Sequence, residues 1–209
     1  SLEDAQAAAA TGQIILAGLW ADLLGKHGIA AAQMLVTLGD FEDRRRFLNA
    51  SATLDRLLSL GVVPILNEND SVATEEIRFG DNDRLAARAA QAARADALVL
   101  LSDIDGLYTA NPAEDPSAEF IPTVSDISAV AHMASRASSS GMGSGGMAAK
   151  VEAARIAHAA GVPVAIVAGA PDHPLKRFIE TGHGTLFEAP DPLTARKAWL
   201  AGRMQVEGR

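Results

Sequence analysis

Apolar side chains along this chain follow two patterns, one typical of helices and one typical of buried strands. In residues 41–60 they recur every three or four positions, so that Leu54 and Leu58 share a face, which predicts a helix. Residues 62–67 and 97–102 are instead almost continuously apolar, which favours strands buried on both faces. The sequence therefore predicts a chain in which helices and strands alternate.

The same patterns, together with glycine and proline at the ends of segments, assign most of the chain. Helices are predicted at residues 2–24, 41–60, 83–94, 126–135, 147–160 and 175–181. Strands are predicted at residues 29–37, 62–67, 97–102, 163–169 and 184–189. This order predicts the α/β class, with a mainly parallel central sheet between two layers of helices in a three-layer αβα sandwich.

Composition narrows the class of protein. The 209 residues are 48% hydrophobic, which is enough for one sizeable domain or two small lobes that share a cleft. The net charge of −8 argues against binding to nucleic acid, which needs clustered Lys and Arg. The absence of cysteine excludes disulfides and thiolate metal sites, and it fits a reducing cytoplasm.

Membrane attachment is not expected from the sequence. No apolar run approaches the roughly 20 residues that are needed to span a bilayer. The first residues, SLEDAQAAAATGQ, lack the basic start and the apolar centre of a signal peptide. We therefore expect a cytoplasmic protein without a membrane partner.

An acidic segment follows one of the predicted strands, at the kind of position where parallel sheets bind ligands. It reads NENDSVATEEIRFGDND and covers residues 67–83. Within it Asp70, Asn82 and Asp83 could bind a polar substrate, orient lysines or hold a divalent cation. The alternative is a solvated loop in which Asp81 or Asn82 caps the next helix.

A second polar segment, SDIDGLYTANP, follows the strand at 97–102. Ser102 and Asp103 end this strand, and Gly106 permits a tight turn. Tyr108 could then lie against a flat ring such as adenine. Taken alone, an ordinary turn at a strand end explains the same residues.

A third segment, GMGSGGMAAK at residues 141–150, is rich in glycine. Consecutive glycines let backbone N–H groups approach an anion, and the positive end of the following helix favours the same ligand. Lys150 would lie in the first turn of that helix, where the helix dipole disfavours a cation unless a phosphate is bound. The alternative is a flexible linker. Because no strand precedes the segment and no Gly-Lys-Ser/Thr occurs, neither a Rossmann nor a Walker A loop is expected.

These segments, taken in order, resemble the amino acid kinase family: FLNASATLDRLL, PILNENDSVAT, FGDNDRLAA, LLSDIDGLYTANP and GSGGMAAKVEAA. Within that family, NEND, GDND and GGM-x-x-K together resemble the enzymes that phosphorylate the γ-carboxylate of L-glutamate in the first step of proline biosynthesis. The resemblance implies ATP as phosphoryl donor, with Mg²⁺ bridging its β- and γ-phosphates. It also implies feedback inhibition by proline and a homo-oligomer, either a dimer or a tetramer.

The resemblance further implies a division of the chain. Residues 1–190 would form the kinase domain, with an amino acid kinase-like fold. Within it, residues 1–68 would be the remainder of the amino-acid-substrate lobe, and residues 69–190 would be mainly the nucleotide-binding lobe. Residues 191–209 would form a C-terminal helix or tail.

Individual residues acquire roles from the same resemblance. Asp70 and Asn82 would bind glutamate, with Asn67 close by. Asp83 would organise catalytic lysines, and Lys150 would stabilise the transferred phosphoryl group. Mg²⁺ would be held mainly by the ATP phosphates, so no metal ligand is expected from the protein. ATP would be bound by Ser102, Asp103, Tyr108, Ser144, Gly145, Gly146, Met147, Ala148, Ala149 and Lys150.

The chain departs from the family pattern at its start. Family members begin with a strand that ends in a Lys-x-Gly-Ser loop, followed by a Ser-Gly-Ala segment, which supply a second lysine and a serine that contacts glutamate. None of the four lysines here follows a strand in such a loop. We therefore expect an N-terminally incomplete domain with little kinase activity alone, since one missing positive group can cost about 10²–10³ in rate.

Two other functions stay open. The first is a sibling kinase that acts on acetylglutamate, aspartate, carbamate or UMP, which the combination of NEND and GDND disfavours. The second is a non-catalytic module that binds ATP and an amino acid without turnover. A carboxylate substrate needs no general base, so the histidines are expected to be surface or packing residues: His27, His132, His158, His173 and His183.

Overall fold

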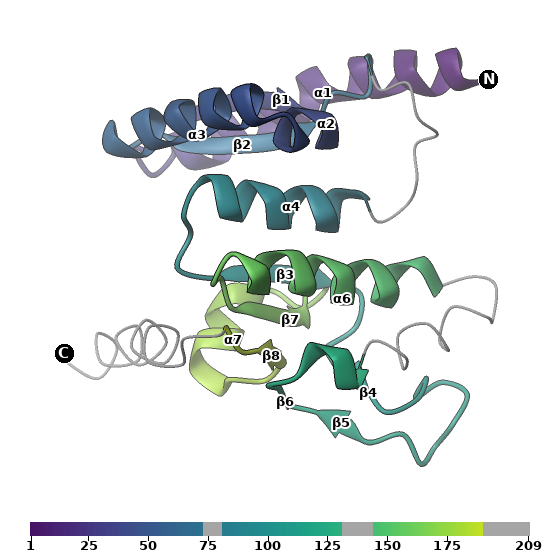
Figure 1. Cartoon of the computed structure of the whole chain (residues 1–209). Coiled ribbons are helices and arrows are strands. Elements are labelled where there is room, and N and C mark those ends of the chain that lie inside the picture. The colour runs from purple at the N-terminus through teal and green to yellow at the C-terminus, as the bar shows by residue number, and fades with distance from the viewer. Residues whose placement is uncertain (73–80, 131–143, 190–209) are drawn as a thin grey trace. The chain divides into compact units, whose positions relative to one another are not determined.

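The computed structural model describes residues 1–72, 81–130 and 144–189 (Figure 1). Helices alternate with strands that pair mostly in parallel, and the fold class is α/β, as predicted. The chain divides into two compact units, Ser1–Ala93 and Arg94–Arg209, which are called the first and the second unit below.

The first unit contains four helices and two strands within its described residues: α1 (Leu2–Gly25), β1 (Ala31–Val36), α2 (Leu38–Glu42), α3 (Arg44–Ser59), β2 (Val63–Glu68) and α4 (Asp81–Ala92). Strands β1 and β2 lie side by side in parallel (Figure 1), in a register that pairs Ala31 with Val63 and Val36 with Glu68. The polar residues after β2 therefore leave the carboxyl edge of this sheet.

The core of the first unit lies among α2, α3, α4 and the end of β1. Its buried residues are Val36, Phe41, Ala50, Leu54, Leu85 and Ala92. A hydrogen bond from the Ser51 hydroxyl to the Ala92 carbonyl oxygen, 2.6 Å long, also joins α3 to α4. These contacts place α4 in the first unit, which ends at Ala93. Which ligand each part binds stays a prediction.

The helix predicted at 41–60 is two helices with a break at Asp43. Thr37 caps α2 in a capping box with Asp40, and Asp43 caps α3 by accepting a hydrogen bond of 2.8 Å from the Arg46 backbone N–H. The backbone of Asp43 is extended, with φ −76° and ψ 120°. Side chains that bond the backbone in this way start a new helix, and this local signal outweighs the continuous apolar period.

Helix α1 corrects the expectation about membrane-spanning length. It has 24 residues with a mean hydropathy of 1.4 in its most apolar 18-residue window, and none of that window is buried. Ile14 and Ile15 are 77% and 72% exposed. By length and composition alone this helix could cross a bilayer, a criterion that core helices of soluble proteins and signal sequences also meet.

The second unit is built on a four-stranded sheet of order β3-β7-β8-β6. Its elements are β3 (Leu98–Ser102), β4 (Leu107–Tyr108), β5 (Phe120–Ile121), β6 (Thr123–Val124), α6 (Ser144–Ala159), β7 (Val164–Ala168), α7 (Pro174–Thr181) and β8 (Thr185–Phe187). The pairs β3–β7 and β6–β8 are parallel, and β7–β8 is antiparallel. Strands β4 and β5 form a separate antiparallel pair.

The four-stranded sheet of the second unit and the β1–β2 sheet of the first unit differ in how far their strands are buried. Val164 and Ile166 of β7 are 0% exposed, as expected for a strand with a neighbour on each side. In the first unit no residue of β2 is buried, which corrects the expectation for residues 62–67. Among the described residues β2 pairs with β1 alone, so this strand is an edge.

The predicted helix at 126–135 is described only at residues 127–130, which are helical, and the predicted tail at 191–209 lies outside the described residues.

Candidate active site

Asn67, the predicted neighbour of the substrate, is fixed by a residue that the sequence did not single out. Its Nδ2 donates a hydrogen bond of 2.6 Å to Oε1 of Gln13, which lies on α1. The Nε2 atom of Gln13 is also buried, but it has no hydrogen-bond partner among the described residues. A buried amide donor without an acceptor costs about 1–3 kcal/mol, so the arrangement favours a ligand that brings an acceptor.

A pocket of about 150 Å³ lies beside this pair in the first unit. It is bounded by α1 on one side and by the carboxyl ends of β1 and β2 on the other. Its lining consists of Ala9, Ala10, Gln13, Ile14, Gln33, Leu35, Glu68, Asn69, Asp70 and Ser71. The pocket therefore combines three side-chain amides, including that of Gln13, with two carboxylates, and one of the carboxylates belongs to the predicted substrate ligand Asp70.

The other two predicted residues of this region, Asn82 and Asp83, lie in the first turn of α4. The helix begins at Asp81, two residues earlier than predicted, so Asp81 and Asn82 are helical residues and not caps. Negative side chains in a first turn are favoured by the helix dipole. Among the described residues, Asp70 lines the pocket, whereas Asn82 and Asp83 do not. The shared role of these three residues therefore stays a prediction.

In the second unit, Ser102 and Asp103 form a closed turn at the end of β3. The buried Ser102 hydroxyl donates to Asp103 Oδ1 at 3.0 Å and accepts from the Ile104 backbone N–H at 3.4 Å. The Gly169 N–H donates to the Ser102 carbonyl at 2.6 Å, which ties the turn to the end of β7. The structure thus brings these two predicted nucleotide ligands together, while their role stays a prediction.

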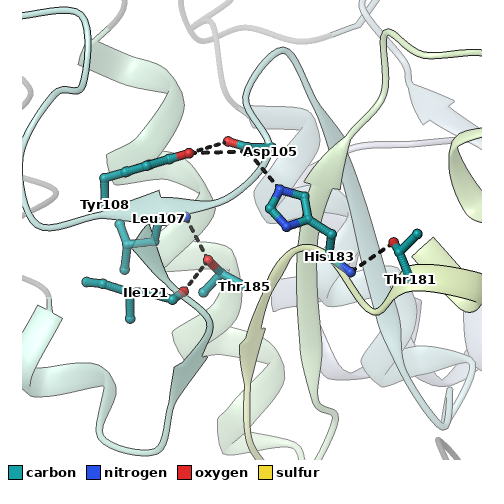
Figure 2. Close-up of polar contacts among 7 residues, drawn as sticks. All are labelled: Asp105, Leu107, Tyr108, Ile121, Thr181, His183 and Thr185. Atoms are coloured by element: carbon teal, nitrogen blue, oxygen red, sulfur yellow. Dashed lines mark hydrogen bonds and ion pairs between the residues drawn. The ribbon is translucent and has the colours of Figure 1, made fainter. Parts of the chain in front are cut away.

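Tyr108 is held by a polar network that Figure 2 shows. Its hydroxyl donates to both oxygens of Asp105, at 3.1 and 3.2 Å, and Nε2 of His183 lies 2.9 Å from Asp105 Oδ2. The Tyr108 ring meets Phe120 edge-on, with 5.4 Å between centroids. These contacts fix the orientation of the side chain that was predicted to face adenine.

The network sets the protonation of its members. Burial raises the pKa of Asp105, but the hydrogen bonds from His183 and Tyr108 outweigh this, so the pKa lies below its usual value. Burial and the neighbouring Asp105 both raise the pKa of Tyr108. At neutral pH Asp105 is therefore a carboxylate, and Tyr108 is a neutral phenol that donates to it.

The glycine-rich segment becomes helical earlier than predicted. Helix α6 starts at Ser144 and not at Met147, so Lys150 lies in the second turn and not in the first. Glycine disfavours helix interiors by about 1 kcal/mol, which is why Gly145 and Gly146 indicated a loop, but here they lie at the helix start. The dipole effect falls off after one turn, so half-buried Lys150 is less disfavoured than expected. Residues 141–143 lie outside the described residues.

Four residues that shape these sites were not predicted from the sequence: Gln13, Asp105, His183 and Thr185. Gln13 stands in an Ala-rich helix with nothing to distinguish it, and its partner Asn67 is 54 positions away. His183 was interpreted as a surface or packing residue. A usable signal was present, because glycines stand on both sides of it at 182 and 184.

Comparisons with known proteins agree on the family. Residues 1–168 match the family described as the amino acid kinase family. Glutamate 5-kinase of Sphingopyxis alaskensis is 64% identical over 210 residues, a match that covers 100% of this chain and 56% of that protein. Glutamate 5-kinase of Zymomonas mobilis is 60% identical and is covered to 53%. The chain thus spans about half the length of the curated relatives that it matches.

Solved structures show the same fold at low identity. E. coli aspartokinase III in complex with aspartate and ADP matches with a TM-score of 0.61 and 20% identity, over 91% of this chain and 42% of that one. UMP kinase from Bacillus anthracis matches with a TM-score of 0.58 and 18% identity, over 90% of this chain and 70% of that one. At such identities the likeness concerns the fold and not the substrate.

Proposed function

The chain belongs to the amino acid kinase family, and on that premise we propose that the protein transfers the γ-phosphoryl group of ATP to the γ-carboxylate of L-glutamate. The product would be L-glutamyl 5-phosphate, and the reaction would be the first step of proline biosynthesis. The observation that carries the proposal is the 64% identity to a glutamate 5-kinase over the whole of this chain. NEND, GDND and GGM-x-x-K all lie within that match.

The amino acid would bind at the turn after β2. Asp70 and Asn82 would hold the ammonium group and the polar end of glutamate, with Asn67 close by. Gln13 would donate its free Nε2–H to a substrate carboxylate, which would satisfy a buried donor that has no acceptor among the described residues. The pocket that Gln13 and Asp70 line together supports this assignment.

The nucleotide would bind at the turn after β3 and at the start of α6. Ser102, Asp103 and Tyr108 would contact the nucleoside, and the segment from Ser144 to Lys150 would bind the phosphates. The first N–H groups of a helix lack partners within the helix and attract phosphate, which supports the second part of this proposal. Lys150 would neutralise the transferred phosphoryl group.

The chemistry would be mainly positioning and charge neutralisation. An oxygen of the substrate γ-carboxylate would form the new bond to the γ-phosphorus, while the bond to the β–γ bridging oxygen breaks and ADP leaves. The carboxylate is already a nucleophile, so no side chain needs to remove a proton. Asp83 would orient lysines toward the phosphates.

Mg²⁺ would be supplied together with ATP and held by its phosphates. Within residues 1–72, 81–130 and 144–189 no three His, Cys, Asp or Glu side chains gather as a metal site. No step is assigned to a metal held by the protein alone.

Three further properties belong to the same proposal. We propose a cytoplasmic location, self-association into a dimer or a tetramer, and inhibition by proline close to the glutamate site. Their support is the resemblance of the sequence segments to the family.

A hydroxamate assay tests the function, because hydroxylamine traps an acyl phosphate. It would be run on these 209 residues and on a chain extended to the length of the curated relatives, called the full-length protein below, with acetylglutamate, aspartate, carbamate and UMP as competing acceptors. We expect product from glutamate in the full-length protein and little product from the 209 residues alone. Preference for another acceptor would overturn the substrate, and binding of ATP and glutamate without product would indicate a non-catalytic module. Equal activity of both proteins would overturn the need for a second lysine.

A further inference from the structure

The backbone around His183 accepts only glycine on either side. Gly182 ends α7 in the left-handed conformation, with φ 68°, which other residues rarely adopt. At Gly184 a Cβ would lie 2.7 Å from the Ile166 carbonyl oxygen and equally close to a Val167 methyl group. The chain therefore has little freedom to point the imidazole elsewhere.

Two contacts then hold the imidazole ring. It stacks on Phe120 with 5.0 Å between centroids and an interplanar angle of 17°. Its Nε2 bonds to Asp105, which also accepts the Tyr108 hydroxyl, as Figure 2 shows. Because Tyr108 in turn packs edge-on against Phe120, the four side chains close a ring of contacts.

Two side-chain anchors hold the turn after β3, in addition to its backbone bond to Gly169, and they differ in chemistry. Thr185, which is fully buried, accepts a hydrogen bond of 2.7 Å from the Leu107 N–H and donates one of 2.6 Å to the Ile121 carbonyl. That anchor contains no titratable group. The bond from His183 to Asp105 is more open, since the two side chains are 57% and 35% exposed. The second anchor can therefore respond to protons.

We propose that His183 is a positioning residue for nucleotide binding: through Asp105 it fixes Tyr108 and the turn that starts at Asp103. The inference rests on the proposed function, because it takes this turn to be part of the nucleotide site. It goes beyond that function by giving His183 a role and by making nucleotide affinity dependent on its protonation.

The expected pH dependence follows from the groups that face His183. Among the described residues these are Asp105 and, through it, Tyr108, while Lys176 and Glu180 of α7 pair with each other at 3.8 Å. A protonated imidazole makes a charge-assisted hydrogen bond to a carboxylate, which is roughly twice as strong as a neutral one. Protonation of the imidazole should therefore strengthen this anchor, and loss of the proton should weaken nucleotide binding.

The test measures ADP binding to the full-length protein by calorimetry at about pH 6 and pH 8. His183→Phe keeps the stacking on Phe120 but loses the bond, and His183→Gln keeps a donor that does not titrate. His173→Gln is the matched control, because His173 is an exposed histidine nearby that makes no side-chain cap bond. The slope is the change in ADP affinity between the two pH values. Each variant's slope is compared with that of the control, so that titration of the nucleotide phosphates cancels.

We expect His183→Phe to bind ADP roughly 3- to 10-fold more weakly than the control at the lower pH, the effect of one lost hydrogen bond. His183→Gln should bind more tightly than His183→Phe, and both should lose the extra pH slope. Asp105→Asn provides a second route to the same loss of slope if His183→Phe does not fold.

The outcomes separate this inference from the proposed function. If the wild-type protein binds ADP and the His183 variants match the control in affinity and slope, the role of His183 is overturned and the function stands. If His183→Phe is weaker at both pH values with an unchanged slope, the histidine is only structural and the inference is again overturned. If the wild-type protein binds no ADP, both proposals fail.

Discussion

The turn after β2 and the turn after β3 follow parallel strands in the two units, and each is tied to its neighbouring strand by a backbone hydrogen bond, but their side-chain contacts differ. In the first unit the Asn69 N–H donates to the Val36 carbonyl at 2.8 Å, which ties the turn to β1, and Asn67 bonds Gln13 beside a pocket, while no residue of β2 is buried. In the second unit the turn is tied to β7 through Gly169 and to β8 through Thr185 and the preceding His183.

This difference bears on how each turn would meet its ligand. The turn after β3 is preorganised, because its polar groups already have partners within the second unit. The pocket beside the turn after β2 contains a buried donor, Nε2 of Gln13 on α1, that lacks an acceptor among the described residues. We infer that the nucleotide side is largely formed without ligand, whereas the amino-acid side is completed by its substrate. Preorganised donors need no rearrangement when charge develops, which suits the side that would handle phosphate.

The largest effect is expected from Lys150→Ala. Removal of one group that neutralises developing charge costs about 10²–10³ in turnover. Lys176→Ala is the control, since this lysine is exposed on α7 and pairs with Glu180. The hydroxamate assay on the full-length protein measures both variants. Equal rates for the two variants would show that Lys150 of α6 has no catalytic role.

The next largest effect concerns stability. Thr185→Val keeps the volume but leaves the Leu107 N–H and the Ile121 carbonyl without their partner, which should lower the free energy of unfolding by about 1–3 kcal/mol. Thr11→Val in the first unit removes only an exposed bond to the Ala7 carbonyl and should change it by about 0.5 kcal/mol or less. Urea unfolding followed by circular dichroism measures both. A similarly small loss of stability for the two variants would contradict the idea that the turn after β3 is firmly anchored.

A smaller effect is expected at the other turn. Gln13→Leu removes the free donor and should weaken glutamate binding roughly 3- to 10-fold, the effect of one hydrogen bond, while ATP binding stays unchanged. Gln6→Leu on the same helix is the control, because Gln6 is not among the residues that line the pocket. Calorimetry with glutamate measures the change. If Gln13→Leu binds glutamate like the control, the pocket beside α1 is not the amino-acid site.

The smallest effect compares one carboxylate in each unit. Burial raises the pKa of Asp40, but hydrogen bonds from Thr37 and Arg46 outweigh it, so the pKa is lowered, as it is for Asp105. Such a group contributes stability above its unfolded pKa of about 3.9 and loses the contribution as pH falls through the lower folded value. Asp40→Asn and Asp105→Asn should therefore each flatten the decline of stability below about pH 4. Urea midpoints measured against pH test this, and unchanged slopes would count against both networks.

The sequence predicted the order of helices and strands because apolar periodicity, and glycine or proline at segment ends, are local properties of the chain. It also placed Asn67, Ser102 and Asp103 at strand ends, where the structure has them. It missed the break at Asp43, although Thr37 and Asp43 carried a local capping signal.

The contacts that shape the two turns could not be predicted in this way. The bond between His183 and Asp105 joins positions 78 apart, and it depends on how β8 returns beside β7. The exposure of β2 and of α1 depends equally on which neighbours each element finds in the fold. These contacts and exposures follow from tertiary packing, which a local sequence pattern does not reveal.

The central claim is that the first unit binds glutamate and the second unit binds ATP, and a crossed binding experiment tests it most directly. Calorimetry would measure glutamate and ATP binding to the full-length protein with Asp70→Asn and with Lys150→Ala. We predict that Asp70→Asn weakens glutamate about tenfold or more, the effect of losing a charged hydrogen bond, and leaves ATP within about twofold. Lys150→Ala should weaken ATP and leave glutamate within about twofold. Equal weakening of both ligands by both variants, or the reverse pairing, would contradict the account.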